Sequence, residues 1–494
     1  MELQLKSKTA PSFQETAHMT QRATISVESV VPDSKEDVGR ILTLQTQLLL
    51  KSKDLVARGA TVGGEAELTL ITVNENETAL STLKFRQPFS LDYELSEIKG
   101  DEELQIRLTM TSSQARLINS RKISAELVVS GELRVFRPVD TVVEYELPEL
   151  PGASLHALTE ERDALLLSTV AEKSFAVHEQ LRLPSDKGRP AELLTHRLEL
   201  SAEQKEVLGE RLLLKGNAQL TLAWLSEDCA EPLTIPFALP FSQLIELSEA
   251  EACAAEVQIE PNSLYLELSD SIEGEKIVDF ELHALAQIRS YRKECVRTVA
   301  DAYSNAMPCE PCFETLQLRE GSEERSAFLR TEESFDMPEG WESLLACFPS
   351  IESVGPERAV ATLDLLIRGR EGRLGVLRRT LTLSGAPELK DCELDSAALT
   401  AADLKREGEK LAVRLEIKAC GRVCRTGEYR TVKCLTLDEE RAFDPASYPA
   451  LTAVWAETES IWELAKLYHS SPEAIAALNP EPVAEAPLLI PKME

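Results

Sequence analysis

Two close pairs of cysteines are the residues of this chain whose type and spacing could do chemistry. Cys309 and Cys312 form a C-x-x-C pair, and Cys420 and Cys424 form a C-x-x-x-C pair. A C-x-x-C pair can bind zinc, but a structural zinc site needs four ligands and this pair supplies two. In a regular strand, Cys420 and Cys424 would stand about 13 Å apart, too far for a disulfide or a shared metal. We therefore expect ordinary thiols, with no metal and no cofactor.

The other candidates for catalysis form no pattern that a known mechanism uses. The sequence contains no H-E-x-x-H zinc motif, no G-x-S-x-G nucleophile elbow and no phosphate-binding or dinucleotide-binding glycine pattern. Carboxylates are abundant, but no pair is singled out for acid–base catalysis. The six histidines are scattered: His18, His156, His178, His196, His283 and His469. The prediction is a protein that is not an enzyme.

A repeat with a period of 152 residues organises most of the chain. A Gly-x-Ala-x-Leu-x-Leu strand begins at Gly64 and again at Gly216, and a Pro-Phe-Ser turn begins at Pro88 and again at Pro240. A third, more divergent copy includes Ala361–Leu365 and lacks the Pro-Phe-Ser motif. This period exceeds the roughly 20 to 50 residues of solenoid repeats and indicates tandem domains.

Each copy ends in a long stretch of alternating apolar and polar residues, around 123–135, 278–289 and 411–423. Side chains alternate faces along a strand, so this pattern predicts sheets with one buried and one solvent-facing side. Such sheets must pack face to face. We predict a mainly β fold in which three tandem antiparallel β-sandwich-like repeats are followed by a small C-terminal domain. The repeats are expected at residues 1–145, 160–300 and 324–438.

Two segments near the boundaries of these units are expected to interrupt the strands. Residues 158–173 contain Thr-Glu-Glu-Arg at 159–162, near their start, which favours a short helix. Residues 308–325 are rich in Glu, Pro and Ser and are predicted to form an exposed linker.

The charge balance restricts the partners that this chain can have. The sequence holds 53 basic and 84 acidic residues, a net charge of −31, which repels phosphate backbones and anionic lipid. We therefore expect a protein partner and no nucleic acid. Since the sequence has no apolar run of about 18 residues and no signal-like start, we expect no membrane insertion and a cytoplasmic location.

The C-terminal tail changes from the strand period to the helix period. Ser460 and Glu463 form a capping-box pattern, and apolar residues follow at helical spacing. A second helix is predicted from Ser471, with a proline in its first position and with Ile475 and Leu478 turned inward. A short strand is expected on each side of the helix pair.

Residues 450–494 resemble the LysM domain family. The matching residues are Ser460, Ile461, Trp462, Leu464, Ala465, Tyr468, Ile475, Leu478, Asn479, Pro480, Ile490 and Pro491. The resemblance implies a small βααβ domain with a shallow groove for N-acetylglucosamine-containing glycans. By position, its groove residues are Thr458, Glu459, Ser460, Ile461, Leu478, Asn479, Pro480 and Glu481. Thr458 and Glu459 stand where the family has Gly and Asp, and both a protein and a glycan stay open as ligands.

The repeats, with the Val-Pro-Asp-Ser-Lys sequence at 31–35, resemble the SPOCS domain of spore-coat-associated proteins. Three such units followed by one LysM domain resemble a family of spore coat morphogenesis proteins. This implies a non-enzymatic scaffold made in the mother cell, which settles on the forespore surface and in the spore coat. There its LysM domain contacts the morphogenetic ATPase of the coat's basement layer, and its repeats contact other coat proteins. The alternative is a peptidoglycan-binding protein whose repeats are spacers. The oligomeric state stays open.

Overall fold

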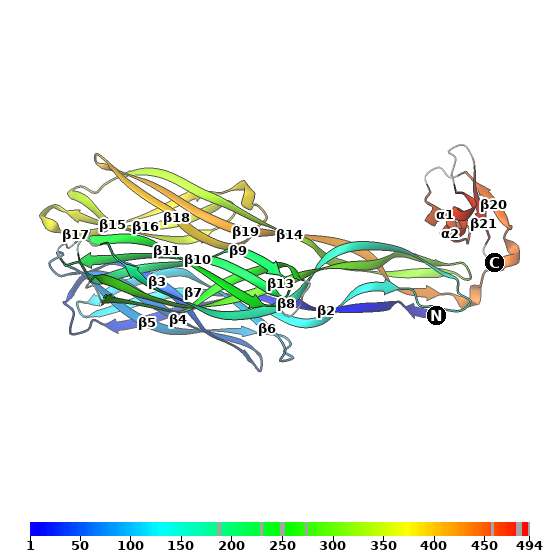
Figure 1. Cartoon of the computed structure of the whole chain (residues 1–494), viewed down its shortest axis with the longest axis horizontal. Helices are drawn as coiled ribbons and strands as arrows, with labels where there is room; N and C mark the ends of the chain where they lie inside the picture. The colour runs from blue at the N-terminus through cyan, green and yellow to red at the C-terminus, as the bar shows by residue number, and fades with distance from the viewer. Residues whose placement is uncertain are drawn as a thin grey trace.

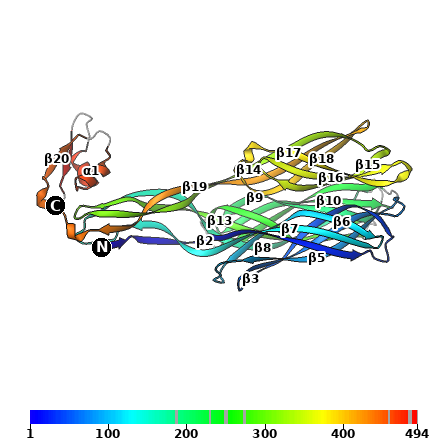
Figure 2. The same cartoon turned by 180° about the vertical axis from the view of Figure 1, so that it is seen from behind.

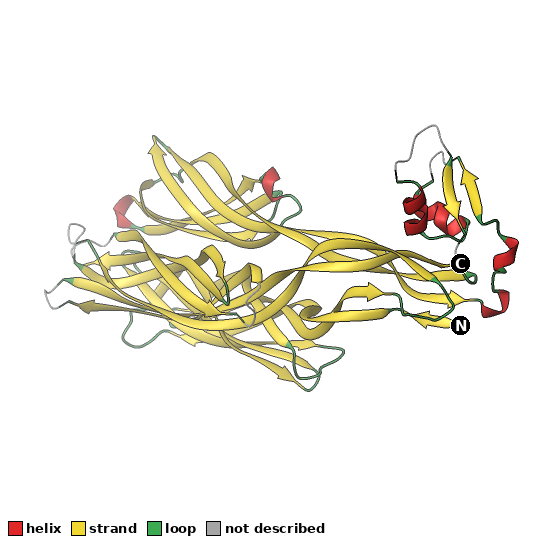
Figure 3. Cartoon of the chain, turned by 45° about the vertical axis from the view of Figure 1, so that its right-hand side comes forward, coloured by secondary structure: helices red, strands yellow, loops and turns green. Residues whose placement is uncertain are grey.

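The computed structural model describes residues 1–184, 189–227, 231–247, 252–271, 275–455, 459–480 and 487–492. Strands make up nearly all of the body, and the two α-helices lie in the C-terminal part (Figures 1 and 3). Neighbouring strands pair antiparallel, except for one parallel contact between β7 and β13 at Glu144 and Arg297. A mainly β fold with several antiparallel sheets is therefore confirmed.

The first group of strands contains two layers that share one core. Strands β3, β4 and β5 form one sheet, and β7 pairs with β2 and β6 in another. Buried side chains from both layers, among them Leu68 and Leu127, form a single cluster. The strands are β2 (Lys6–Val30), β3 (Val38–Val56), β4 (Gly59–Asn74), β5 (Leu80–Glu94), β6 (Glu103–Asn119) and β7 (Lys122–Glu146).

The same order of pairing recurs in the second group, which surrounds a core that contains Trp224 and Leu282. Its β9, β10 and β11 form one sheet, and β13 pairs with β8 and β12. The strands are β8 (Leu155–Arg182), β9 (Pro190–Leu208), β10 (Arg211–Ser226), β11 (Pro232–Glu246), β12 (Ala252–Asp270) and β13 (Lys276–Ser304).

In the third group, β15, β16 and β17 form a sheet, and β19 pairs with β14 and β18 around a core that contains Leu363 and Leu415. The short β1 (Glu2–Gln4) also pairs with β19. The strands are β14 (Cys309–Asp336), β15 (Trp341–Val354), β16 (Arg358–Gly369), β17 (Leu374–Ser384), β18 (Glu393–Glu407) and β19 (Lys410–Leu437). Short 3-10 turns are η2 (Arg370–Gly372), η3 (Pro387–Leu389), η4 (Glu439–Arg441) and η5 (Pro445–Ser447).

The predicted alternation is present along most of the last long strand of each group. Leu127 in β7, Leu282 in β13 and Leu415 in β19 are fully buried, and their sequence neighbours are more exposed. The prediction is wrong at Gln287 and Arg422, which the alternation places on the solvent-facing side and which are buried. The prediction that the opposite faces are wet is wrong for the three-stranded sheets. Residues from all three groups form a further core there: Leu42, Ile71, Val73, Leu194, Ala223, Ala346, Phe348, Leu366 and Leu374. The groups therefore pack against one another around a shared junction.

The long strands continue beyond the sheets into a narrow stem that ends near both chain termini (Figures 1 and 2). β13 has 29 residues, roughly 95 Å at the rise of an extended strand. The stem has a small apolar core of its own: Tyr145, Val299, Ala302, Val432 and Leu435. The stem places the C-terminal end of β13 far from the three-stranded sheets.

Three sequence-based expectations about local structure are wrong. Residues 158–173 lie inside β8 and not in a helix, because this whole segment pairs with β13. Residues 308–325 are largely the start of β14, not an exposed linker, because they pair with β19. The Pro-Phe-Ser motifs lie inside β5 and β11 and make no turn. Long-range pairing decides the conformation of these segments against their local composition.

None of the helices in the described ranges is long and apolar enough to cross a membrane.

Candidate functional site

The C-terminal segment forms a small module in which two strands flank two helices. These elements are β20 (Leu451–Val454), α1 (Ile461–Leu467), α2 (Pro472–Leu478) and β21 (Leu488–Pro491), with β20 and β21 paired antiparallel. The capping box is confirmed, since Ser460 Oγ accepts from Glu463 N and the Glu463 carboxylate accepts from Ser460 N. Ser471 caps α2, whose first residue is a proline.

Asn479 closes the module at the end of α2. Its side-chain nitrogen donates to the carbonyl oxygens of Ile475 at 2.7 Å and Leu489 at 2.8 Å, and its oxygen accepts from Leu489 N at 2.9 Å. Asn479 thus joins α2 to β21, and its amide is occupied by this structural role.

The module is attached to the end of β13 by polar contacts. Asp301 accepts from the Trp462 indole nitrogen at 2.9 Å and from Lys466 Nζ at 2.8 Å. Burial opposes ionisation of Asp301, but the hydrogen bonds from Lys466 and Trp462 outweigh it and hold its pKa below the usual value. The carboxylate is therefore charged near neutral pH and binds two donors on one face of α1.

Tyr303 completes the attachment from inside the module's core. It is buried with Leu464, Ala465 and Ile475, and its ring meets that of Trp462 edge-on at 4.9 Å. Its hydroxyl donates to the Ser470 carbonyl at 2.7 Å. Burial raises the pKa of Tyr303, so this hydroxyl keeps its proton. A residue of β13 is thus part of the core of the C-terminal module, which fixes the module on the stem.

The structure describes only some of the predicted groove residues. Thr458 and Glu481 lie outside the described residues. Glu459, Ser460 and Pro480 are exposed, and Ser460 serves as the cap of α1.

The two apolar groove residues point outward. Ile461 is 42% and Leu478 is 46% exposed, so the prediction that Leu478 turns inward is wrong, whereas Ile475 is buried as predicted. Among the described residues of the module, the exposed large apolar side chains are Leu451, Trp455, Ile461, Leu467 and Leu478.

The C-x-x-C pair does not act as a pair. Cys309 and Cys312 lie three residues apart in β14, which turns their side chains to opposite faces. Cys312 is instead the cross-strand partner of Cys434 in β19. Burial raises the pKa values of Cys309 and Cys434 to about 11, so both thiols stay protonated near neutral pH.

The sequence analysis missed a cluster of two histidines and a glutamate, because it treated the histidines as scattered. The structure brings His178 and His283 to the same carboxylate, that of Glu281. Strand alternation alone places Glu281 and His283 on one face, a signal present in the sequence. The approach of His178 depends on the pairing of β8 with β13, which are separated by four other strands.

Searches against protein-family models, curated proteins and solved structures find no match for this chain.

Proposed function

We propose that this chain is a non-enzymatic scaffold for bacterial spore coat assembly, a SipL-like spore coat morphogenesis protein. In this proposal each group of six strands is a SPOCS-type β-sandwich repeat, and the C-terminal module is a LysM-type domain. The module docks to the basement-layer ATPase on the forespore surface, in the mother-cell cytoplasm. The repeats provide surfaces for other coat proteins.

The observation that carries the proposal is the display of apolar side chains on a fixed terminal module. Trp455 is 67% and Leu467 is 66% exposed, although a module of this size has few apolar residues for its own core. Covering such side chains with a partner gains about 25 cal/mol for each Å² of apolar surface.

The attachment to β13 adds to this argument. Asp301 and Tyr303 hold the module at the end of the stem, away from the sheets (Figure 1). A module that is already ordered and oriented loses less entropy when a partner binds. A long stem with an anchored terminal module suits a protein that bridges two layers of an assembly.

A second candidate function is peptidoglycan binding, and the exposure of Trp455 favours it. An exposed indole offers a flat apolar face and one hydrogen-bond donor, which suits stacking against a sugar ring. In that function the stem and the sheets are spacers.

The test offers the full chain separately to a purified coat basement-layer ATPase and to peptidoglycan sacculi. We expect capture of the ATPase, and loss of capture when Trp455→Ser and Leu467→Ser are combined. A matched control combines Leu244→Ser and Phe328→Ser, which are 49% and 47% exposed on the sheets. Retention on sacculi without ATPase capture would replace the scaffold function with the glycan one, and equal capture by both double variants would exclude the module as the docking surface.

A further inference from the structure

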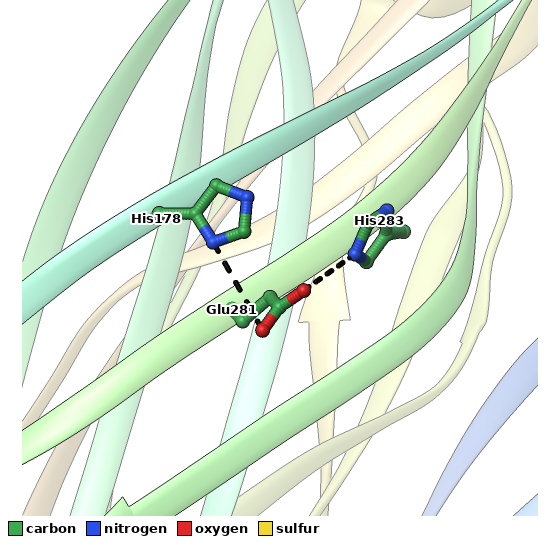
Figure 4. Close-up of side chains that lie close together, drawn as sticks. All are labelled: His178, Glu281 and His283. Carbon is green, nitrogen blue, oxygen red and sulfur yellow. Dashed lines mark hydrogen bonds and ion pairs between the residues drawn. The ribbon is translucent and has the colours of Figure 1, made fainter.

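We propose that His178, Glu281 and His283 form a surface site for a divalent transition-metal ion, with Zn²⁺ as the expected ion. The site lies on the outer face of the β8–β13 pair and is independent of the C-terminal module. Figure 4 shows the two imidazoles on either side of the Glu281 carboxylate.

The strand pairing builds the cluster. Glu281 in β13 is the direct cross-strand partner of His178 in β8, and His283 follows Glu281 by two residues. Residues two apart in a strand share a face, and cross-strand partners have Cβ atoms about 5 Å apart. All three side chains therefore leave the sheet in the same direction, from backbone that the ladder holds in place.

The ligand atoms are close enough for one ion to collect them. His283 Nε2 lies 2.7 Å from Glu281 Oε1, and His178 Nδ1 lies 4.0 Å from Glu281 Oε2. One ligand atom from each residue lies within 4.8 Å of the others. Ligands of tetrahedral zinc stand about 3.3 Å apart, given Zn–N bonds of about 2.05 Å. The exposed side chains reach this spacing by small rotations.

The chemistry of the donors fits a transition metal. Imidazole nitrogens and a carboxylate are ligands that Zn²⁺ accepts together, and three protein ligands leave a coordination position for water. The Glu281 side chain is 43% exposed, which gives an ion direct access from solvent.

The surroundings favour a cation. Cross-strand partners of Glu281 and His283 on this face are His178, Ala176, Tyr265 and Ser263, and none of the four is a Lys or Arg. Asp279 precedes Glu281 by two residues and adds a second carboxylate to the same face, held by Ser269 and Gln180. The site therefore attracts positive charge.

A similar pair elsewhere in the chain provides a contrast. His18 Nε2 lies 2.7 Å from Glu132 Oε1, the same distance as between His283 and Glu281. That pair has no second imidazole, and Arg134 donates to the same Glu132 oxygen at 3.2 Å. A guanidinium in this position repels a metal ion, so the His18 pair serves as an internal control.

The experiment is zinc titration of the full chain by isothermal calorimetry after its thiols have been alkylated, which removes cysteine as a competing ligand. We expect one Zn²⁺ per chain, and an affinity at least about tenfold weaker in His178→Gln and in His283→Gln. His18→Gln should bind like the unaltered chain. Because all three histidines are exposed, these variants should fold, which circular dichroism checks.

A second readout is thermal unfolding. Zinc should raise the Tm of the alkylated chain, because it binds the folded pair of strands and not the unfolded chain. The rise should be absent in the double variant His178→Gln, His283→Gln. Unchanged zinc affinity in that double variant, or a loss of affinity in His18→Gln equal to that in the other variants, would overturn the proposal.

Discussion

The ring of Phe89 lies over Gly64, its cross-strand partner, so closely that a Cβ atom on Gly64 would meet Phe89 Cζ at 2.3 Å. Phe241 and Gly216 repeat this arrangement in the second group of strands, also at 2.3 Å. The Gly-x-Ala-x-Leu-x-Leu and Pro-Phe-Ser motifs thus contact each other across neighbouring strands. In this contact the aromatic ring of one motif covers the glycine backbone of the other.

The third group of strands shows what happens when the ring is lost. Ala361–Leu365 aligns with Ala218–Leu222 of the second copy at an offset of 143 residues, which places Ala359 where Gly216 stands. Ala359 pairs with Leu383, and both are fully buried. A larger residue on one strand thus comes with a smaller one on its partner, so that the volume of the pair is kept.

This relationship predicts a suppressor. Gly64→Ala should lower the free energy of unfolding by about 1–3 kcal/mol, because the added methyl group displaces the Phe89 ring. Adding Phe89→Leu should restore part of this loss, as in the third group. In contrast, Phe241→Leu should not rescue Gly216→Ala, because the Ser201 carbonyl lies 2.2 Å from the added Cβ position and backbone cannot yield. Urea unfolding of the two single and the two double variants measures the loss and the rescue at each site. Equal rescue at the two sites would contradict the packing argument.

The attachment of the C-terminal module can be tested at Asp301. Asp301→Ala removes the acceptor of Trp462 and Lys466 and should weaken docking by about 1–3 kcal/mol. Hydrogen exchange in α1 and proteolysis between residues 438 and 450 should both become faster, while the sheets stay protected. The control is Asp163→Asn, whose ion pair with Lys293 is exposed and should contribute little. Equal protection of α1 in both variants would show that Asp301 is not needed to hold the module.

A buried ionic cluster joins the second and third groups of strands. Glu256 forms an ion pair with Arg289 at 3.0 Å, accepts a hydrogen bond from Arg319 at 2.6 Å, and also pairs with Arg422. Burial opposes its ionisation, but these guanidinium groups lower the pKa of Glu256 to about 2. Its contribution to stability is therefore complete above pH 4.5 and is lost as the pH falls toward about 2.

Glu256→Gln should be strongly destabilising, by about 3–5 kcal/mol, because it removes the buried carboxylate that Arg289 and Arg319 pair with. Arg422 keeps its second partner, Asp395, at 2.6 Å. The matched control is Glu323→Gln, which breaks an exposed ion pair with Arg325 and should cost less than about 1 kcal/mol. Urea unfolding at neutral pH checks both variants. Similar losses of unfolding free energy in the two variants would mean that burial does not determine how much these ion pairs contribute to stability.

The sequence predicts the parts of this fold that depend on local pattern. Alternation along β7, β13 and β19 identifies their buried faces, and the spacing of Ser460 and Glu463 identifies the start of α1. The shared junction of the three groups could not be predicted, because Leu42, Leu194 and Leu366 come from three different copies and each sheet was expected to bury only one face. The meeting of His178 with Glu281 depends on strand register, which pairs residues about 100 positions apart.

The last prediction concerns Glu260, a buried carboxyl group at the contact between the first two groups. Its Oε1 accepts from Gln258 at 2.8 Å and its Oε2 from the Leu108 amide at 3.4 Å. Burial outweighs these contacts and raises the pKa of Glu260 to about 7. The unfolded chain then releases this proton at a lower pH than the folded chain does. Stability should therefore fall as the pH rises from 4.5 to about 7.

Glu260→Gln removes this charge and should raise the free energy of unfolding at about pH 8 by up to about 3 kcal/mol, with little change at about pH 5. Urea unfolding at both pH values, followed by tryptophan fluorescence, measures the difference. Glu267→Gln on the same strand is the control, because Glu267 is exposed and its replacement should leave the pH dependence unchanged. An equal effect of Glu260→Gln at both pH values would show that the amide changes packing and not titration, since only a raised pKa makes the gain depend on pH.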